Sequence, residues 1–207
     1  MSHAPAWWDP FPAERFWLGL PSVEGDVMHL ATPQLDGRHV RTRSHELIRR
    51  VRRGDVVFHY DEVRQGIVAW SQPRGRLERR MLDWTIDPSE SGGRRDEVRA
   101  QPSWTMPLGH VTPIEPMVPL DQVARAQWGL FPALRALEDA VGAPLEYPFA
   151  ICSPVETLVL AGHVFKLPAI LIERIPGLAG VADQMEWFSP AASAGRHLVP
   201  ARTQVAA

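Results

Sequence analysis

The chain has 207 residues, a formal net charge of −2 and an apolar content of 45%, which together indicate one globular domain with an ordinary core. Its single cysteine, Cys152, excludes an internal disulfide, and no apolar run approaches the roughly 20 residues of a membrane helix. Residues 1–11 lack the basic start and apolar stretch of a secretory signal. We therefore expect a cytoplasmic protein with no membrane partner.

Arginine is distributed unevenly along the chain. Fifteen arginines fall between Arg38 and Arg99, against ten acidic residues, so this stretch nets about +5 and the remainder about −7. A GC-rich genome would explain why Lys166 is the only lysine, but it would not explain the clustering. Clustered arginine with interleaved tryptophan is typical of surfaces that bind nucleic acid, because arginine contacts phosphate and tryptophan stacks on bases.

The first third of the chain predicts a short extension, two strands and a helix. Residues 1–14 are rich in Pro and Ala and are expected to be an N-terminal extension, whose aromatic residues could pack back on the domain. Residues 15–20 and 25–30 are apolar enough for strands. A helix is predicted over residues 44–53, with Ser44 as its N-cap and Gly54 after its end. Its apolar stripe is Leu47, Ile48 and Val51.

A β-hairpin is the clearest prediction in the sequence. Residues 55–60 and 66–71 are two apolar runs separated by a five-residue polar connection. Residues 72–101 are then predicted to be a long polar loop, and excursions of that length are usually functional.

The second half predicts strands and helices in a mixed order. Residues 104–111 and 148–151 are expected to be strands, and residues 164–166 to be extended. Two helices are predicted around Pro132, the first from Leu120 to about Trp128 and the second ending at Gly142, with a last helix over residues 168–175. The Ala/Ser/Pro-rich residues 189–207 are expected to be a flexible tail or linker. The pattern predicts an α+β fold with a small curled sheet and flanking helices.

Several segments, in order, resemble the EVE-like branch of the PUA superfamily, which is related to YTH domains. The best matching segment is Gly54–Tyr60, followed by Gly66–Ser71, and residues 16–18 are similar to the start of the first EVE strand. The other matching segments are Trp84, Pro102-Ser103-Trp104, Pro119-Leu120, Pro148-Phe149 and Gly162–Pro168. The last two are similar to segments of EVE modules found beside HNH nucleases in bacterial restriction proteins. The resemblance covers roughly residues 15–178.

The resemblance implies a curled β-barrel that reads a modified base extruded from its strand. It implies a reader domain over residues 15–188 that binds modified DNA, with the base held between aromatic side chains. The partner would be a nuclease domain or subunit, because such modules serve restriction and defence systems. The family pattern places pocket aromatics at Trp17 and Trp84.

The candidate site residues fall into two groups. The expected walls and edges of the base pocket are Trp17, Tyr60, Trp70, Ser71, Trp84 and Trp104. The expected contacts to the nucleic-acid backbone, all on one face, are Arg49, Arg50, Arg52, Arg53, Arg74, Arg76, Arg79 and Arg80. Trp84 is the preferred pocket wall because it lies in the predicted loop, and for the same reason Trp84→Ala is expected to spare folding. Ordinary core packing is the competing interpretation for each tryptophan.

Catalytic motifs are not recognisable in the sequence. It has no HExxH pattern, no cysteine pair and no glycine-rich phosphate loop, and Lys166 lacks the acidic residue two positions earlier that a restriction-type catalytic site needs. We therefore expect no cofactor, no metal site and no catalytic residues in this chain. The expected function is binding of DNA that carries a modified base, with 5-methylcytosine as the model case. The alternatives are a YTH- or PUA-like RNA reader and a protein-interaction module that uses the basic loop.

Overall fold

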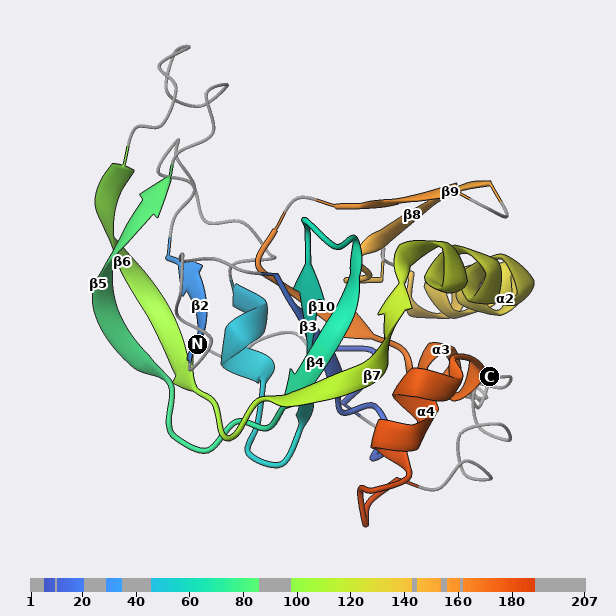
Figure 1. The fold of residues 1–207 in the computed structure, drawn as a ribbon, viewed down its shortest axis with the longest axis horizontal. Helices are drawn as coiled ribbons and strands as arrows, with labels where there is room; N and C mark the ends of the chain where they lie inside the picture. Colours follow the sequence, from blue (N-terminus) through green and yellow to red (C-terminus); the bar gives the residue numbers. More distant parts are fainter. Residues whose placement is uncertain are drawn as a thin grey trace, which may run out of the picture.

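The protein has a mixed α+β fold, as the sequence predicts. The structure, a computed structural model, describes residues 6–9, 11–20, 29–34, 46–85, 98–142, 145–153, 156–160 and 162–188. A three-stranded sheet lies on one side of a central five-stranded sheet, and the helices α2, α3 and α4 lie on the other side (Figure 1). The predicted tail, residues 189–207, lies outside the described residues, and none of the described helices is long and apolar enough to cross a membrane.

The five-stranded sheet contains the predicted hairpin. Its strand order is β10 (Val164–Leu167), β1 (Phe16–Gly19), β3 (Val56–Asp61), β4 (Gly66–Ser71) and β7 (Thr112–Pro119). Strands β3 and β4 pair antiparallel, which confirms the hairpin, whereas β1 pairs parallel with β3 and antiparallel with β10. Strands β1 and β10 are buried along their whole length, so neither shows a polar–apolar alternation; β1 is a continuous apolar run, and β10 is apolar except for the buried Lys166.

The three-stranded sheet corrects the prediction of a long loop. Its order is β2 (His29–Pro33), β6 (Val98–Pro107) and β5 (Glu78–Thr85), so the supposed loop over residues 72–101 holds all of β5 and the start of β6. The sequence did not predict β5 because the successive residues from Glu78 to Met81 are all exposed, so the apolar and polar residues do not alternate as in a half-buried strand.

One bent ribbon joins the two sheets. An isolated bridge pairs Pro73 with Leu108, and the flanking backbone bonds run from Arg74 N to Pro107 O at 2.9 Å and from Gly109 N to Gln72 O at 2.8 Å. Pairing of β4 with β7 therefore continues into pairing of β5 with β6, and the ribbon turns sharply between the sheets (Figure 1). The described strands do not close into a barrel.

The predicted helix at residues 44–53 is a single 3-10 turn in the described part of the chain. This turn, η1 (Leu47–Arg50), buries Leu47 and Ile48, and Val51 after it is also buried, so the predicted apolar stripe is confirmed. Its main contacts are with β10, β6 and β2 rather than with the β3–β4 hairpin that follows it in the sequence.

Helix α2 (Leu120–Val141) replaces the two helices predicted around Pro132. Proline inside a helix removes one hydrogen bond and costs about 3 kcal/mol. Buried residues on both sides, Val123, Leu130 and Leu134, continue one stripe through this position and hold the helix together. Gly142 adopts the left-handed conformation at φ 66°, so the predicted helix stop is confirmed.

The C-terminal elements complete the core. Strands β8 (Phe149–Ser153) and β9 (Glu156–Val159) form a hairpin against α2. Helix α3 (Ala169–Arg174) confirms the helix predicted over residues 168–175, and a further short helix, α4 (Pro176–Ala182), follows it. Trp7 and Trp8 of the N-terminal extension belong to the core as well, because both are buried in it. This packing places the N-terminal segment beside β1 and the loop after η1.

Candidate nucleic-acid interface

A pocket of about 330 Å³ opens between the N-terminal segment, the loop after η1 and the segment that follows α4, which carries Trp187. Its volume is at the lower end of the range typical of small-ligand sites. Four aromatic rings and four guanidinium groups surround it, together with three carboxylates and one proline. The lining residues are Trp8, Asp9, Phe11, Pro12, Glu14, Arg15, Trp17, Arg50, Arg52, Arg53, Asp55 and Trp187.

The aromatic walls are fixed by contacts with one another. The rings of Trp7, Trp8 and Trp17 form a chain of edge-to-face contacts, with centroids 5.5 Å apart for the first pair and 5.6 Å for the second. Elsewhere in the lining, the Arg15 guanidinium lies over the Trp187 ring at 4.7 Å from its centroid. Trp8 and Trp17 are buried by this packing and stiffen the lining, whereas Phe11 and Trp187 are half-buried and supply the ring surface that a ligand can reach.

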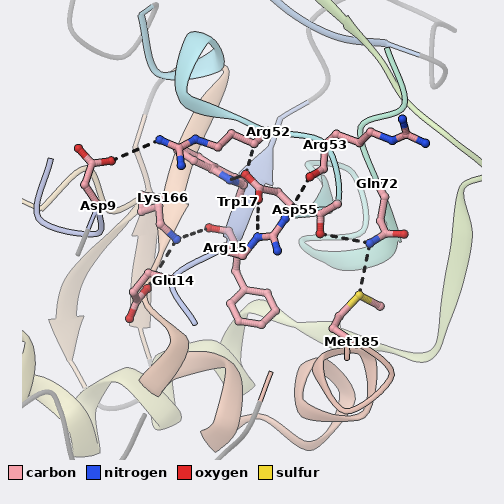
Figure 2. Close-up of polar contacts among 12 residues, drawn as sticks. Asp9, Glu14, Arg15, Trp17, Arg52, Arg53, Asp55, Gln72, Lys166 and Met185 are labelled. Atoms are coloured by element: carbon pink, nitrogen blue, oxygen red, sulfur yellow. Dashed lines mark hydrogen bonds and ion pairs between the residues drawn. The ribbon is translucent and has the colours of Figure 1, made fainter. Parts of the chain in front are cut away.

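The Asp55 carboxylate organises the base of the pocket (Figure 2). It accepts hydrogen bonds from Arg15 Nε at 2.9 Å, from Trp17 Nε1 at 2.8 Å and from the Arg52 backbone N–H at 2.9 Å. Gly54, at φ 81°, makes the tight turn before it possible, because a Cβ there would meet Arg15 Nη2 at 3.0 Å. Gly54 and Asp55 therefore hold the pocket residues Arg15 and Trp17 in place as well as beginning the hairpin.

A buried ion pair lies behind the walls formed by Glu14 and Trp17. Lys166 Nζ is 3.6 Å from Glu14 Oε2 and donates to Phe16 O at 2.8 Å and to Leu167 O at 3.1 Å. The Glu14 carboxylate also accepts the Ala169 N–H at the start of α3 at 3.0 Å. Burial lowers the pKa of Lys166 to about 8, against the raising effect of the Glu14 and Asp55 charges.

The carboxylates of the pocket are engaged by neighbouring cations. Asp9 lies 3.5 Å from Arg50 Nη1 and 3.8 Å from Arg52 Nη2, while Asp55 and Glu14 are bound as described above. Arg53 is exposed, and no carboxylate of the described residues lies within ion-pair distance of its guanidinium. The pocket therefore offers flat rings and surplus positive charge, which favours a planar ligand attached to an anionic group.

Of the predicted site residues, Trp17, Arg50, Arg52 and Arg53 line this pocket. Trp104 does not. It lies on β6, half-buried, with the Arg79 guanidinium 4.6 Å and the Arg49 guanidinium 5.4 Å from its ring centroid. Trp104 therefore belongs to a separate arginine–tryptophan cluster.

Trp84 is neither in a loop nor among the residues that line the pocket. It is a buried residue of β5, where its Nε1 donates to Ser103 Oγ at 2.8 Å and its ring contacts His163 with centroids 4.7 Å apart. The reason given for preferring it, a position in a polar loop, is wrong. We now expect Trp84→Ala to damage folding rather than to spare it.

The other predicted pocket residues belong to the hairpin. Tyr60 and Ser71 are buried, Trp70 is half-buried, and none of the three lines the pocket. Ser71 Oγ is 2.8 Å from His59 Nε2, and burial lowers the pKa of His59 to about 4. This pair is a polar contact inside the sheet, because a fully buried Ser71 has no access to a ligand.

The predicted arginines do not share a single face. Arg79 and Arg80 are consecutive in β5, so their side chains leave opposite faces of the strand. Arg79 lies over Trp104, whereas Arg80 is paired with Glu78 at 2.7 Å. Arg74 and Arg76 are exposed on the segment between β4 and β5.

Sequence reasoning missed much of the pocket. Trp8, Phe11 and Arg15 come from or follow a segment interpreted as an extension, and Trp187 was not among the candidate site residues. The available signal was the density of aromatic residues in a segment otherwise rich in Pro and Ala. Asp55 was recognisable only as a hairpin start.

No known protein family matches the sequence, and no curated protein matches it either. In the part of the chain that the structure describes, His, Cys, Asp and Glu form no group of three or more that could hold a metal ion.

Proposed function

We propose that this protein binds DNA by accepting an extruded base, a modified cytosine, in the pocket between the N-terminal segment and the loop after η1. The observation that carries the proposal is the combination of packed aromatic rings with surplus guanidinium charge around one pocket of about 330 Å³. The resemblance to EVE-type modules narrows the base to a modified cytosine and suggests a nuclease domain or subunit as partner.

The energetics of such binding are balanced. Extruding a base costs a few kcal/mol of stacking, and aromatic side chains return ~1–3 kcal/mol per base. A methyl group adds only about 0.8 kcal/mol on burial. Discrimination between modified and plain bases therefore needs rigid walls, and the ring contacts of Trp8 and Trp17 and the hydrogen bonds of Asp55 supply that rigidity.

We propose further that the fold is a curled PUA/EVE-like barrel. The ribbon that passes from the five-stranded to the three-stranded sheet supports this proposal, because curvature of that kind brings two sheets around one core. In this proposal the chain acts as a reader without its own catalytic site.

The test is a binding titration with labelled oligonucleotides that carry 5-methylcytosine, 5-hydroxymethylcytosine or plain cytosine, as DNA and as RNA. Trp187→Ala removes a half-buried pocket ring, and Trp128→Ala removes an exposed ring on α2 as the matched control. We expect modified DNA to bind best. Trp187→Ala should weaken that binding by the ~1–3 kcal/mol of one stacking contact, and Trp128→Ala should leave it unchanged.

Two outcomes would overturn the proposal. Equal affinity of the wild-type protein for modified and plain DNA would show that the protein does not recognise the modified base. Tighter binding to RNA than to DNA would favour the RNA reader instead. Circular dichroism of both variants establishes that a loss of binding is not a loss of fold.

A further inference from the structure

The predicted backbone arginines differ in whether a carboxylate already neutralises them. Arg49, Arg50, Arg52 and Arg80 each have an acidic partner, namely Glu46, Asp9, Asp9 and Glu78. For Arg53, Arg74 and Arg76, the described residues provide no such partner, and all three side chains are exposed. An unpaired guanidinium can bind a phosphate without first giving up an ion pair.

These three arginines lie along one edge of the molecule. Gln72 Nε2 donates to Gly54 O at 3.3 Å, so the segment that carries Arg74 and Arg76 lies beside the loop that carries Arg53. Both segments lie along the lower edge of the molecule in Figure 1. Arg53 lines the pocket, and its guanidinium extends away from the Asp55 network (Figure 2).

The position of Arg74 is further defined by Gly109. A Cβ built on Gly109 would lie 2.6 Å from Arg74 Nε and 3.1 Å from its Cδ, so the arginine side chain lies across the glycine. Glycine thus permits Arg74 to lie flat along the turn between the sheets. The backbone bond from Arg74 N to Pro107 O at 2.9 Å fixes the base of the same side chain.

We propose that Arg53, Arg74 and Arg76 form a phosphate track that leads away from the pocket on one side of the extruded base. The proposal rests on the proposed function of the pocket and adds the path of the DNA strand. Its ligand is the phosphate backbone next to the read nucleotide. Of the ion-paired arginines, Arg50 and Arg52 would then shape the pocket rim, whereas the three unpaired ones supply affinity.

The test compares two triple variants with the same change of charge. Arg53→Gln/Arg74→Gln/Arg76→Gln removes the track. Arg64→Gln/Arg125→Gln/Arg135→Gln removes three exposed arginines that are paired with Asp61, Asp121 and Glu138 in the β3–β4 loop and on α2. Affinity for a duplex with one 5-methylcytosine is measured against salt concentration. Each lost phosphate contact should lower the slope of log affinity against log salt by about 0.9.

We expect the track variant to lose about 2.7 from the slope, three contacts at 0.9 each, and to keep the wild-type preference for the modified base. The control triple should keep the wild-type slope. An unchanged slope in the track variant, or equal losses in both triples, would overturn the track and leave the pocket proposal intact. Failure of the wild-type protein to bind DNA at low salt would instead overturn the proposed function.

Gly109→Ala provides a finer version of the test, because it displaces the Arg74 side chain without changing the charge. We expect a loss of about one contact, 0.9 in slope. An unchanged slope would remove Arg74 from the track.

Discussion

At the residue scale, Asp55 shows how one buried carboxylate can position a whole site. Its two oxygens hold the indole of Trp17, the guanidinium of Arg15 and the backbone of Arg52. Hydrogen bonds to a charged group stabilise a fold by about 1.5–3 kcal/mol each. The orientation of the Arg15 and Trp17 side chains in the pocket lining therefore depends on one buried carboxylate.

His59 gives a prediction about acid stability. Burial lowers its folded-state pKa to about 4, below the usual value of 6.5. As the pH falls from 6.5 towards 4, the unfolded chain binds a proton that the folded chain does not, so stability falls. One pKa unit corresponds to about 1.4 kcal/mol, so between pH 6.5 and 5 the loss should be about 1–2 kcal/mol.

Urea denaturation at the two pH values measures this loss. The His59→Gln variant should lose less between them, since glutamine does not titrate. Equal losses in the wild type and the variant would show that other groups determine the acid response.

At the element scale, polar contacts and buried tryptophans attach residues 6–9 and 11–14 of the N-terminal segment to the rest of the domain. Glu14 joins it to Lys166 and to the start of α3, and Asp9 joins it to the loop after η1. Trp7 and Trp8 add buried aromatic surface. The segment supplies one side of the pocket, so its attachment determines whether the pocket exists.

The Glu14–Lys166 pair should therefore behave as a coupled unit. Lys166→Met leaves the Glu14 carboxylate buried without its cation and should destabilise the protein by about 3–5 kcal/mol. The double variant Glu14→Gln/Lys166→Met removes both charges and should recover part of that loss. The free energies of unfolding of the wild type, both single variants and the double variant form the cycle. Strictly additive losses would show that the pair is not coupled.

Several elements could be predicted from the sequence, and the failures have physical causes. The hairpin and the helix stop at Gly142 follow from local pattern and turn chemistry. Strand β5 was not predicted because it carries exposed charges on both faces. Helix α2 was predicted as two helices because proline usually ends a helix, whereas here the buried stripe continues on both sides of Pro132. In both cases tertiary packing overrides the local signal.

At the scale of the whole molecule, the pocket combines three parts of the chain that are distant in sequence. The three parts are Trp8 to Trp17, Arg50 to Asp55, and Trp187. They meet because β1 pairs with β3 and because Trp187, in the segment after α4, packs against Phe16 of β1. Composition indicated that arginine and tryptophan matter, and four of the fourteen predicted residues line the pocket. The other lining residues could not be predicted from the sequence, because no local pattern encodes contacts between such distant parts of the chain.

Because both the N-terminal segment and Trp187 close the pocket, a bound ligand should stabilise the whole fold. A ligand that binds only the folded state adds about 2.7 kcal/mol at 100 times its Kd. For a protein of this size, 1 kcal/mol corresponds to about 2–4 °C in Tm. An oligonucleotide with 5-methylcytosine, at 100 times its Kd, should therefore raise Tm by about 5–11 °C. The same concentration of plain DNA should raise Tm less, and the difference should shrink in Trp187→Ala but persist in Trp128→Ala. A Tm that rises equally with both DNAs would mean that the backbone alone is bound, and the pocket would then have no part in recognition.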